Sequence, residues 1–219
     1  MLTPVRKEKP QERTAPPTSV VRELHPNRGL HDASLVAEIL RGSTDAAGTF
    51  FDRYGNHVER LLWSLLGPEN EAEDLLHEVF VRALEGMGDL EDPTRLRSWL
   101  TGITVHTARE WIRRRVRRKW LRFVEELPDT PILSASEEVT EATRCTYEIL
   151  QGMSTDDRLV FSLRFIEGLE MADVAVACDV SLSTAKRRLK DAEKHFLARA
   201  KRIAALRPWI EEGGRWAIE

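Results

Sequence analysis

Hydrophobic side chains recur every three or four residues along most of this chain. That spacing places them on one stripe of an α-helix. No strand-like alternation of useful length interrupts the pattern. Stripes of this kind are buried when helices pack together, so the sequence predicts an all-α protein. The clearest run ends at Gly67-Pro68 and contains Phe50, Phe51, Tyr54, Val58, Leu61, Leu62 and Leu65.

The predicted helices fall into two groups, which we expect to be two small domains. The segment EELPDTPILSASEE between them has two prolines, clustered acid and no helical period, and it predicts a flexible acidic linker. The first 30 residues contain five prolines and predict a disordered arm. The expected parts are the arm 1–30, a first domain 31–124, the linker 125–141, a second domain 142–206 and a tail 207–219.

Individual helices follow from the same apolar period. In the first domain we expect one helix from Ser34 to Gly42 and a second that contains the apolar run from Phe50 to Leu65 and ends at Gly67. Two more helices are expected, over about 70–86 and over about 95–123. In the second domain the expected helices are 142–152, 156–167, 171–178 and 182 to about 206.

Composition excludes several classes of protein. Hydrophobic residues make up 42% of the chain, yet no apolar run approaches the ~20 residues that cross a bilayer. The two cysteines, Cys145 and Cys178, lie far apart and are typical of reduced thiols. No metal-ligand spacing, phosphate-binding loop or nucleophile motif occurs. We therefore expect a cytoplasmic protein without membrane insertion, cofactor, metal or catalytic residues.

Charge is distributed very unevenly along the chain, whose net charge is only −3. Residues 101–122 carry +7 and residues 181–202 carry +6, whereas 31–100, 125–148 and 149–180 carry −8, −6 and −4. A solvated surface normally mixes both signs. Two short basic blocks in an acidic protein indicate two places where a polyanion is held.

The first basic block, REWIRRRVRRKWLR, has eight Lys or Arg residues in fourteen positions and two tryptophans. Its bases fall on nearly every side of the predicted helix, and like charges four residues apart, such as Arg113 and Arg117, repel by roughly 0.2–0.5 kcal/mol. An anionic partner would compensate this repulsion. Aromatic side chains among bases favour single-stranded or distorted nucleic acid. The alternative for each tryptophan is core packing, which we favour for Trp99 on the apolar stripe.

The second basic block has the layout of a helix-turn-helix. In MADVAVACDVSLSTAKRRLKDAEKHF, the small Ala175 lets two helices cross closely, Asp179-Val180 makes the turn, and Ser181 caps the second helix. In such a motif the start of the second helix enters the major groove. The alternative is a helical hairpin with a solvated basic face. The side expected to face inward is Leu182, Ala185, Leu189, Ala192 and Phe196; the side expected to face outward is Ser183, Thr184, Lys186, Arg187 and Lys190.

Together these segments resemble a bacterial RNA polymerase sigma factor of the extracytoplasmic-function (ECF) group. The similarity rests on their order: EAEDLLHEVFVRA, then RSWLTGITVHTAREWIRRRVRR, an acidic linker, and DDRLVFSLRFIEGLEMADVAVACDVSLSTAKRRLKDA. It covers about residues 33–202. The resemblance implies a DNA-binding subunit with no catalysis of its own, which gives core polymerase promoter recognition and strand opening.

The resemblance also implies roles for individual residues. The helix matching 71–83 would dock on the clamp of the largest polymerase subunit through Asp74, Glu78 and Arg82, with the flap as a further polymerase contact. The helix matching 97–118 would capture the melted minus-ten element, one base being flipped into a protein pocket. Its candidates are His106, Arg109, Arg113, Arg114 and Arg117. The minus-thirty-five element would be bound by Ser183, Thr184, Lys186, Arg187 and Lys190, with Arg164 near the DNA backbone.

The family pattern further implies an anti-sigma factor as a partner. The sequence departs from that pattern at several positions: His106 and Glu110 stand where Asn and Asp are usual, Cys178-Asp179 replaces Leu-Gly, and Asp191 replaces a frequent Arg. These changes concern promoter preference and leave the class unchanged.

Two other functions compete with the sigma-factor hypothesis. A stand-alone helix-turn-helix regulator would use its first domain to dimerise or to sense a ligand, but it has no need for the acidic helix. A helical hydrolase built on His77-Glu78 lacks a second metal ligand at helical spacing.

Overall fold

The computed structural model describes residues 28–67, 71–121 and 137–208, and every regular element within those ranges is helical. The all-α prediction is confirmed. The first unit, residues 28–121, consists of α1 (Arg28–Leu40), α2 (Thr44–Leu66), α3 (Ala72–Glu85), the 3-10 turns η1 (Met87–Asp89) and η2 (Pro93–Arg95), and α4 (Leu96–Leu121). The second unit, residues 137–208, consists of α5 (Glu137–Gln151), α6 (Thr155–Phe161), the π-helical turn η3 (Ser162–Ile166), α7 (Met171–Ala177), α8 (Leu182–Ala200) and η4 (Ala204–Leu206).

Several predicted boundaries differ from the observed ones. Helix α1 begins at Arg28, inside the predicted arm, and α5 begins at Glu137, inside the predicted linker. Helix α8 ends at Ala200, and a short turn follows it. The rest of the arm, the linker and the tail lie outside the described residues.

In the first unit, α2 packs against α1, α3 and α4. Ser43 caps α2 by accepting a hydrogen bond from the Ala46 amide at 3.2 Å. Asp32 of α1 is buried and is satisfied by α2, because the Tyr54 hydroxyl and the Arg53 guanidinium both donate to it at 2.8 Å. This buried carboxylate is paired, as burial of a charge requires.

The second unit has a small core of its own around α5, α6 and α8. Phe161 and Phe196 are buried there with ring centroids 4.8 Å apart, and Leu150 packs among them. Ser154 caps α6 by accepting from the Asp157 amide at 3.2 Å. Beyond Phe161 the helix widens into the π-helical turn η3.

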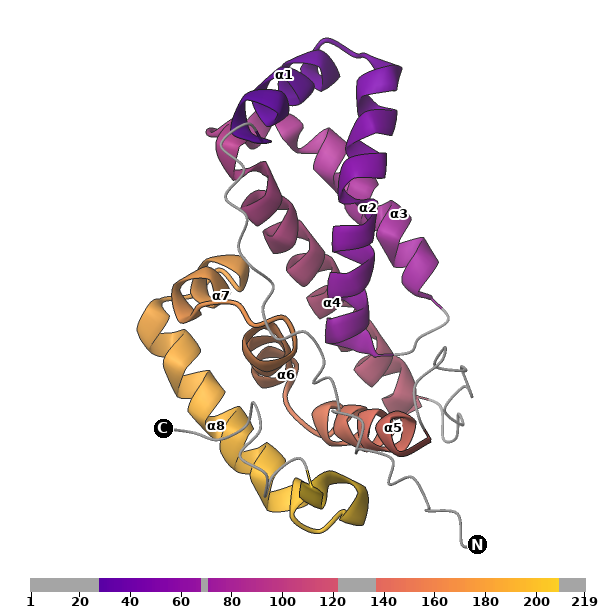
Figure 1. Cartoon of the computed structure of the whole chain (residues 1–219), viewed down its shortest axis with the longest axis vertical. Coiled ribbons are helices and arrows are strands. Elements are labelled where there is room, and N and C mark those ends of the chain that lie inside the picture. Colours follow the sequence, from indigo (N-terminus) through magenta and orange to yellow (C-terminus); the bar gives the residue numbers. More distant parts are fainter. Residues whose placement is uncertain (1–27, 68–70, 122–136, 209–219) are drawn as a thin grey trace, which may run out of the picture.

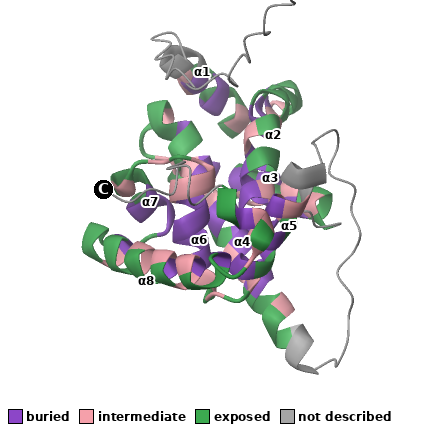
Figure 2. Ribbon diagram, turned by 60° about the horizontal axis from the view of Figure 1, so that its bottom comes forward, coloured by how far each residue is buried: buried purple, intermediate pink, exposed green. Residues whose placement is uncertain are grey.

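The two units also share one continuous hydrophobic core. Leu159, Leu163 and Val174 of the second unit belong to the same buried cluster as the core of the first unit. Helix α4 contacts both α6 and α7, so α6 and α7 lie beside α4 in Figure 1. Figure 2 shows the buried residues of α4 and α6 together in the middle of the molecule. The apolar pattern predicts two units, whereas their packing against each other was not predicted.

Polar contacts fix the second unit against the C-terminal end of α2. The Arg158 side chain is only 5% exposed, and it donates to the carbonyl oxygens of Leu65 at 3.0 Å and Leu66 at 2.9 Å. These carbonyls have no partner within α2, and the helix dipole makes that end negative. The Tyr147 hydroxyl donates to the Trp63 carbonyl at 3.0 Å.

Gly67 is required at this junction for two reasons. Its φ of 79° lies in the left-handed region, and a Cβ there would lie 2.8 Å from the Tyr147 ring. The chain turn that ends α2 is therefore matched to a side chain from the other unit.

We predict that His57 makes the fold sensitive to acid. Burial, together with the positive charges of Arg97 and Arg60, lowers the pKa of His57 to about 4. The unfolded pKa is about 6.5, so the unfolded chain takes up this proton first as the pH falls. The stabilisation is complete above about pH 6.5 and is lost as the pH falls towards 4.

Urea unfolding at pH 7 and pH 5 measures this effect. When the pH falls from 7 to 5, the free energy of unfolding of the wild type should decrease by up to about 2 kcal/mol more than that of His57→Gln. The same replacement at the exposed His77 serves as the control and should keep the wild-type pH dependence. Equal pH dependence in wild type and His57→Gln would contradict the prediction.

Candidate nucleic-acid interface

Helices α7 and α8 form the predicted helix-turn-helix. Ala175 is buried where the two helices pack, and Ala185, Ala192 and Phe196 face inward from α8. Ser181 caps α8 as predicted, since its hydroxyl accepts from the Thr184 amide at 3.2 Å. The prediction for Leu182 is wrong, because this side chain is 43% exposed at the first position of the helix.

The start of α8 presents polar and basic side chains away from the core. Ser183, Lys186, Arg187 and Lys190 are exposed, and Thr184 is half-buried with its hydroxyl 2.8 Å from that of Ser181. This surface fits the predicted DNA-binding role of these five residues, which stays a prediction.

The turn between the helices is made by Asp179 in place of the usual glycine. Its φ is 53°, in the left-handed region where glycine is free of strain and Asp is tolerated. The turn is closed by a hydrogen bond from the Val180 amide to the Ala175 carbonyl at 3.0 Å.

Arg164 is engaged within the protein. It lies in η3 and donates to the Leu169 carbonyl at 3.0 Å, with Glu170 at 3.8 Å. These contacts hold the segment that leads into α7. Its predicted role near the DNA backbone stays a prediction.

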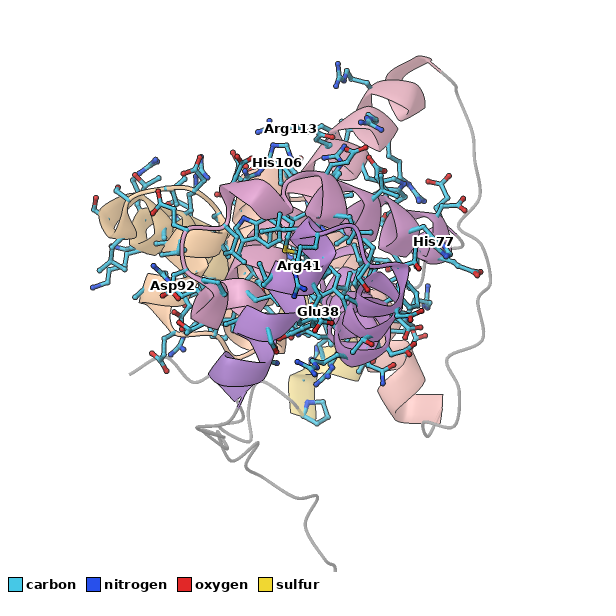
Figure 3. The ribbon with its side chains drawn as sticks, turned by 90° about the horizontal axis from the view of Figure 1, so that it is seen from above. Glu38, Arg41, His77, Asp92, His106 and Arg113 are labelled. Carbon is cyan, nitrogen blue, oxygen red and sulfur yellow. The ribbon has the colours of Figure 1, made fainter. Side chains whose placement is uncertain are left out.

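Helix α4 carries the first basic block, and its arginines differ in exposure. Arg113 and Arg114 are each more than half exposed, and Arg117 is exposed. Arg114 pairs with Glu110 at 3.1 Å. Figure 3 shows His106 and Arg113 on the same side of the molecule, and His106 is 59% exposed.

Arg109 is the exception among the predicted minus-ten residues. Its side chain is only 14% exposed. Its Nε lies 3.2 Å from Asp156 of α6, and its Nη2 donates to the Cys178 carbonyl at 2.9 Å. In this arrangement Arg109 contacts the second unit, and its predicted DNA-binding role stays a prediction.

A hollow of about 500 Å³ lies beside α4. One wall is formed by Trp99 and His106 of α4 and by the loop that contains Asp92; the opposite wall comes from Val176 and Asp179. Hydrogen bonds from the hydroxyl and amide of Thr94 lower the pKa of Asp92. The hollow therefore combines an aromatic surface with a carboxylate and an imidazole, which can stack on a base and hydrogen-bond to it. The predicted core packing of Trp99 is borne out in part, because it is partly buried against the core and also lines this hollow.

Polar contacts join helix α3 to α4. Arg82 pairs with Glu78 at 2.6 Å and with Glu110 at 2.7 Å, and these contacts raise the pKa of Arg82 and lower that of Glu110. Near the start of α3, the Trp111 indole N–H donates to Glu71. Asp74 is exposed and Glu78 is half-buried, so acidic side chains are accessible on the outer face of α3.

Three charged residues that make contacts within the protein were not predicted from the sequence: Asp156, Arg158 and Arg188. Their partners lie far away in the sequence, and no local pattern marks them. The burial of Arg158 in particular runs against the usual exposure of arginine.

Comparison with known proteins matches both units to sigma-factor families. Residues 50–118 match the family model for Sigma-70 region 2, and residues 143–196 match the model for Sigma-70, region 4. The ECF RNA polymerase sigma factor SigX of Bacillus subtilis is 30% identical over 157 residues, which covers 67% of this chain and 81% of SigX. The chain belongs to the ECF sigma factors.

This membership confirms the family resemblance. The chain is a sigma factor that directs transcription initiation, and the stand-alone regulator is not favoured. The RNA polymerase sigma-H factor of Pseudomonas aeruginosa is 25% identical over 197 residues, with 83% of this chain and 96% of that protein covered.

Two solved structures share the fold of this sigma factor. CnrH, in complex with the cytosolic domain of CnrY, aligns with a TM-score of 0.56 and 22% identity over 79% of this chain and 99% of CnrH. The sigma factor RpoE of Bartonella quintana, in complex with the anti-sigma factor NepR, aligns with a TM-score of 0.56 and 21% identity over 70% and 96% of the two chains. Within the described part of this sigma factor, no helix is long and apolar enough to cross a membrane.

We predict that Asp179→Gly stabilises the sigma factor slightly. Glycine removes the strain of the left-handed backbone but costs more conformational entropy on folding, so the net gain should be about 0.5 kcal/mol. Urea unfolding measures it. The matched control is Asp173→Gly in the first turn of α7, which should lose about 0.5–1 kcal/mol through lower helix propensity and loss of an acidic charge near the helix N-terminus. A loss of stability in Asp179→Gly would contradict the account of the turn.

Proposed function

We propose that this sigma factor acts as a non-catalytic, dissociable subunit that holds a promoter at two sites while it is docked on core RNA polymerase. The proposed parts are residues 31–124 for polymerase docking and the minus-ten element, and 142–206 for the minus-thirty-five element. In this proposal the remaining segments of the chain are the arm 1–30, the linker 125–141 and the tail 207–219.

The observation that carries this proposal is the exposed basic surface at the start of α8. Near the capped start of α8, three basic side chains are exposed: Lys186, Arg187 and Lys190. The net charge of the whole chain is negative. The start of such a helix can enter the major groove, where lysine and arginine side chains bind guanine edges and phosphates. The hydroxyls of Ser183 and Thr184 lie beside the cap, where they can bind a phosphate.

Helix α4 would hold the minus-ten element after the strands separate. Arg113, Arg114 and Arg117 would bind the backbone, and the hollow beside Trp99 and His106 would receive an unpaired base. Trapping bases in this way offsets the lost stacking, about 1.4 kcal/mol per step, so strand opening is driven by binding.

The outer face of α3 would dock on the clamp of the largest polymerase subunit. Asp74 and Glu78 supply negative charge there, and Arg82 is held by Glu78 and Glu110. A negative face repels duplex DNA, so this surface is suited to a protein partner. We include the polymerase flap as a second docking site for this sigma factor.

We also propose a cytoplasmic location and an anti-sigma factor as a regulatory partner. RpoE of Bartonella quintana is an example of this fold bound to an anti-sigma factor. Co-purification from cells under non-inducing conditions tests this partner, and isolation only as free protein or holoenzyme would count against it.

The proposed docking of α3 on polymerase makes one prediction. Asp74→Arg reverses an exposed charge on α3 and should weaken association with core polymerase by about tenfold, or about 1.4 kcal/mol. Glu38→Arg makes the same change on the exposed face of α1 and should have little effect. Surface plasmon resonance with immobilised core enzyme measures both. Equal affinity of Asp74→Arg and wild type would remove α3 from the docking surface.

The proposed role of α8 at the minus-thirty-five element makes another prediction. Promoters can be found by mapping the 5′ ends of transcripts that the reconstituted holoenzyme starts on bacterial genomic DNA. On such a promoter Lys186→Ala should weaken holoenzyme binding, and loss of a phosphate contact should lower the log–log salt slope by about 0.9.

The control is Lys194→Ala, which removes an exposed lysine two turns further along α8. It should keep the wild-type affinity and salt slope. If the holoenzyme starts no specific transcripts, the proposed function fails as a whole; if the two lysine variants behave alike, only the assignment of the α8 surface fails.

A further inference from the structure

Helix α4 carries a single acidic residue. Among its 26 residues Glu110 is the only Asp or Glu, whereas eight are Lys or Arg. The Glu110 side chain is 36% exposed. A carboxylate on a surface proposed to bind DNA repels phosphates, so Glu110 on its own would weaken binding. Its contacts indicate a different role.

The two oxygens of Glu110 contact three side chains. Oε2 accepts hydrogen bonds from Arg82 of α3 at 2.7 Å and from Arg114, one turn further along α4, at 3.1 Å. Oε1 lies 3.7 Å from Nδ1 of His106, one turn back along the same helix. The hydrogen bond from Arg82 is the main cause of the lowered pKa of Glu110, so this carboxylate is ionised at neutral pH. Glu110 therefore joins α3 to two side chains of the proposed strand-binding surface.

The two ring nitrogens of His106 have different surroundings. Nδ1 faces the pair formed by Arg82 and Glu110, with Nη1 of Arg82 at 3.5 Å. Within the described ranges Nε2 has no partner, and the side chain is 59% exposed. His106 also lines the hollow that contains Trp99 and Asp92. One edge of the imidazole is thus held by the protein, and the other edge is free to bind a ligand.

The contact with Arg82 also determines what His106 can offer. Of the two groups that face Nδ1, only the guanidinium lies within hydrogen-bonding distance, and it can only donate. Nδ1 is therefore the acceptor, and Nε2 carries the hydrogen. A base in the hollow would meet an N–H donor at this point of the wall.

We propose that Glu110 is a positioning residue for base recognition, which together with Arg82 fixes the Nδ1 edge of His106 and directs Nε2 at an unpaired base in the hollow. The contact is one hydrogen bond from Nε2–H to an acceptor atom of a base in the melted minus-ten strand. Glu110 itself does not touch DNA. This inference rests on the proposed function of α4 and adds a residue that selects the base there.

Order at His106 matters because discrimination between bases depends on geometry. A ring that samples several rotamers meets all four bases in many orientations, whereas a ring held in one rotamer favours the base whose acceptor lies opposite it. Each half-exposed contact of Glu110 contributes little to stability. Replacing Glu110 should therefore change base recognition and leave the fold intact.

The variant Glu110→Gln separates positioning from simple repulsion, because the two explanations predict opposite effects. Loss of a repelling charge would tighten binding to every promoter sequence. Loss of positioning should weaken binding and reduce discrimination at one base, although α4 has become more positive.

The experiment uses holoenzyme with saturating core polymerase and a promoter found by transcript mapping. Labelled probes are unpaired over the minus-ten element and differ from one another in one unpaired base, and fluorescence anisotropy gives a Kd for each. Base discrimination at a position is the ratio of the weakest to the tightest Kd. His106→Ala identifies the position read by this side chain, where discrimination should fall from about tenfold to about twofold.

Glu110→Gln should produce the same fall at that position, from about tenfold to about twofold, and weaken binding of the best probe by about threefold. Discrimination at the other unpaired positions should stay within about twofold of wild type. In the His106→Ala background the Glu110→Gln change should reduce discrimination no further, because Glu110 acts through His106. The matched control is Glu38→Gln, which makes the same change at an exposed residue of α1 outside the hollow and should equal wild type.

Three outcomes would overturn the proposal. The first is tighter binding of Glu110→Gln to all probes, which is the result of repulsion alone. The second is wild-type discrimination by either His106→Ala or Glu110→Gln. The third is a further loss when Glu110→Gln is added to His106→Ala, because Glu110 then acts on α4 as a whole.

The same preparations distinguish this inference from the proposed function. Promoter-specific transcription by the wild-type holoenzyme, with wild-type discrimination by Glu110→Gln, removes only the positioning role. Absence of specific transcription by the wild-type holoenzyme removes the proposed function.

Discussion

A buried arginine at the end of a helix holds this molecule together. Arg158 brings its charge from α6 to the free carbonyls at the C-terminus of α2, where the helix dipole favours a cation. A buried guanidinium without those acceptors would be strongly unfavourable, so its position is determined by the end of α2. The left-handed turn at Gly67 and the Tyr147 ring fit the same junction. The shared hydrophobic core and the pairing of Asp156 with α4 both depend on this placement of the second unit.

The basic helix α4 is stabilised by acids from two directions. On one side Glu110 joins Arg82 of α3 and Arg114 of α4 itself; on the other side Asp156 of α6 joins Arg109 and Arg113. The first set lies within one unit and fixes α4 against α3. The second set crosses between units and is lost when they separate. A helix with so many like charges thus has acidic partners on two sides.

Most of the fold could be predicted from the sequence, since three-to-four spacing of apolar residues in helices such as α2 is a local signal. The start of α5 was predicted too late because clustered acid was read as a linker, although acidic residues are equally typical of the first turn of a helix. The cap at Ser181 and the outward bases of α8 also follow from local spacing. The contacts of Asp156 and Arg158 could not be predicted, because they join residues about 30 to 90 positions apart and a buried arginine carries no sequence signal.

The two units pack against each other in this structure, whereas the proposed promoter contacts require each unit to reach its own element when the protein is bound to polymerase. Fluorescent labels on Glu38→Cys in α1 and Lys194→Cys in α8, both at exposed positions, report the separation of the two units by energy transfer. Labelling is compatible with the native cysteines because both are buried. The account predicts one high-transfer population in the free protein and a shift to low transfer on addition of core polymerase. Low transfer in the free protein, or transfer unchanged by polymerase, would contradict it.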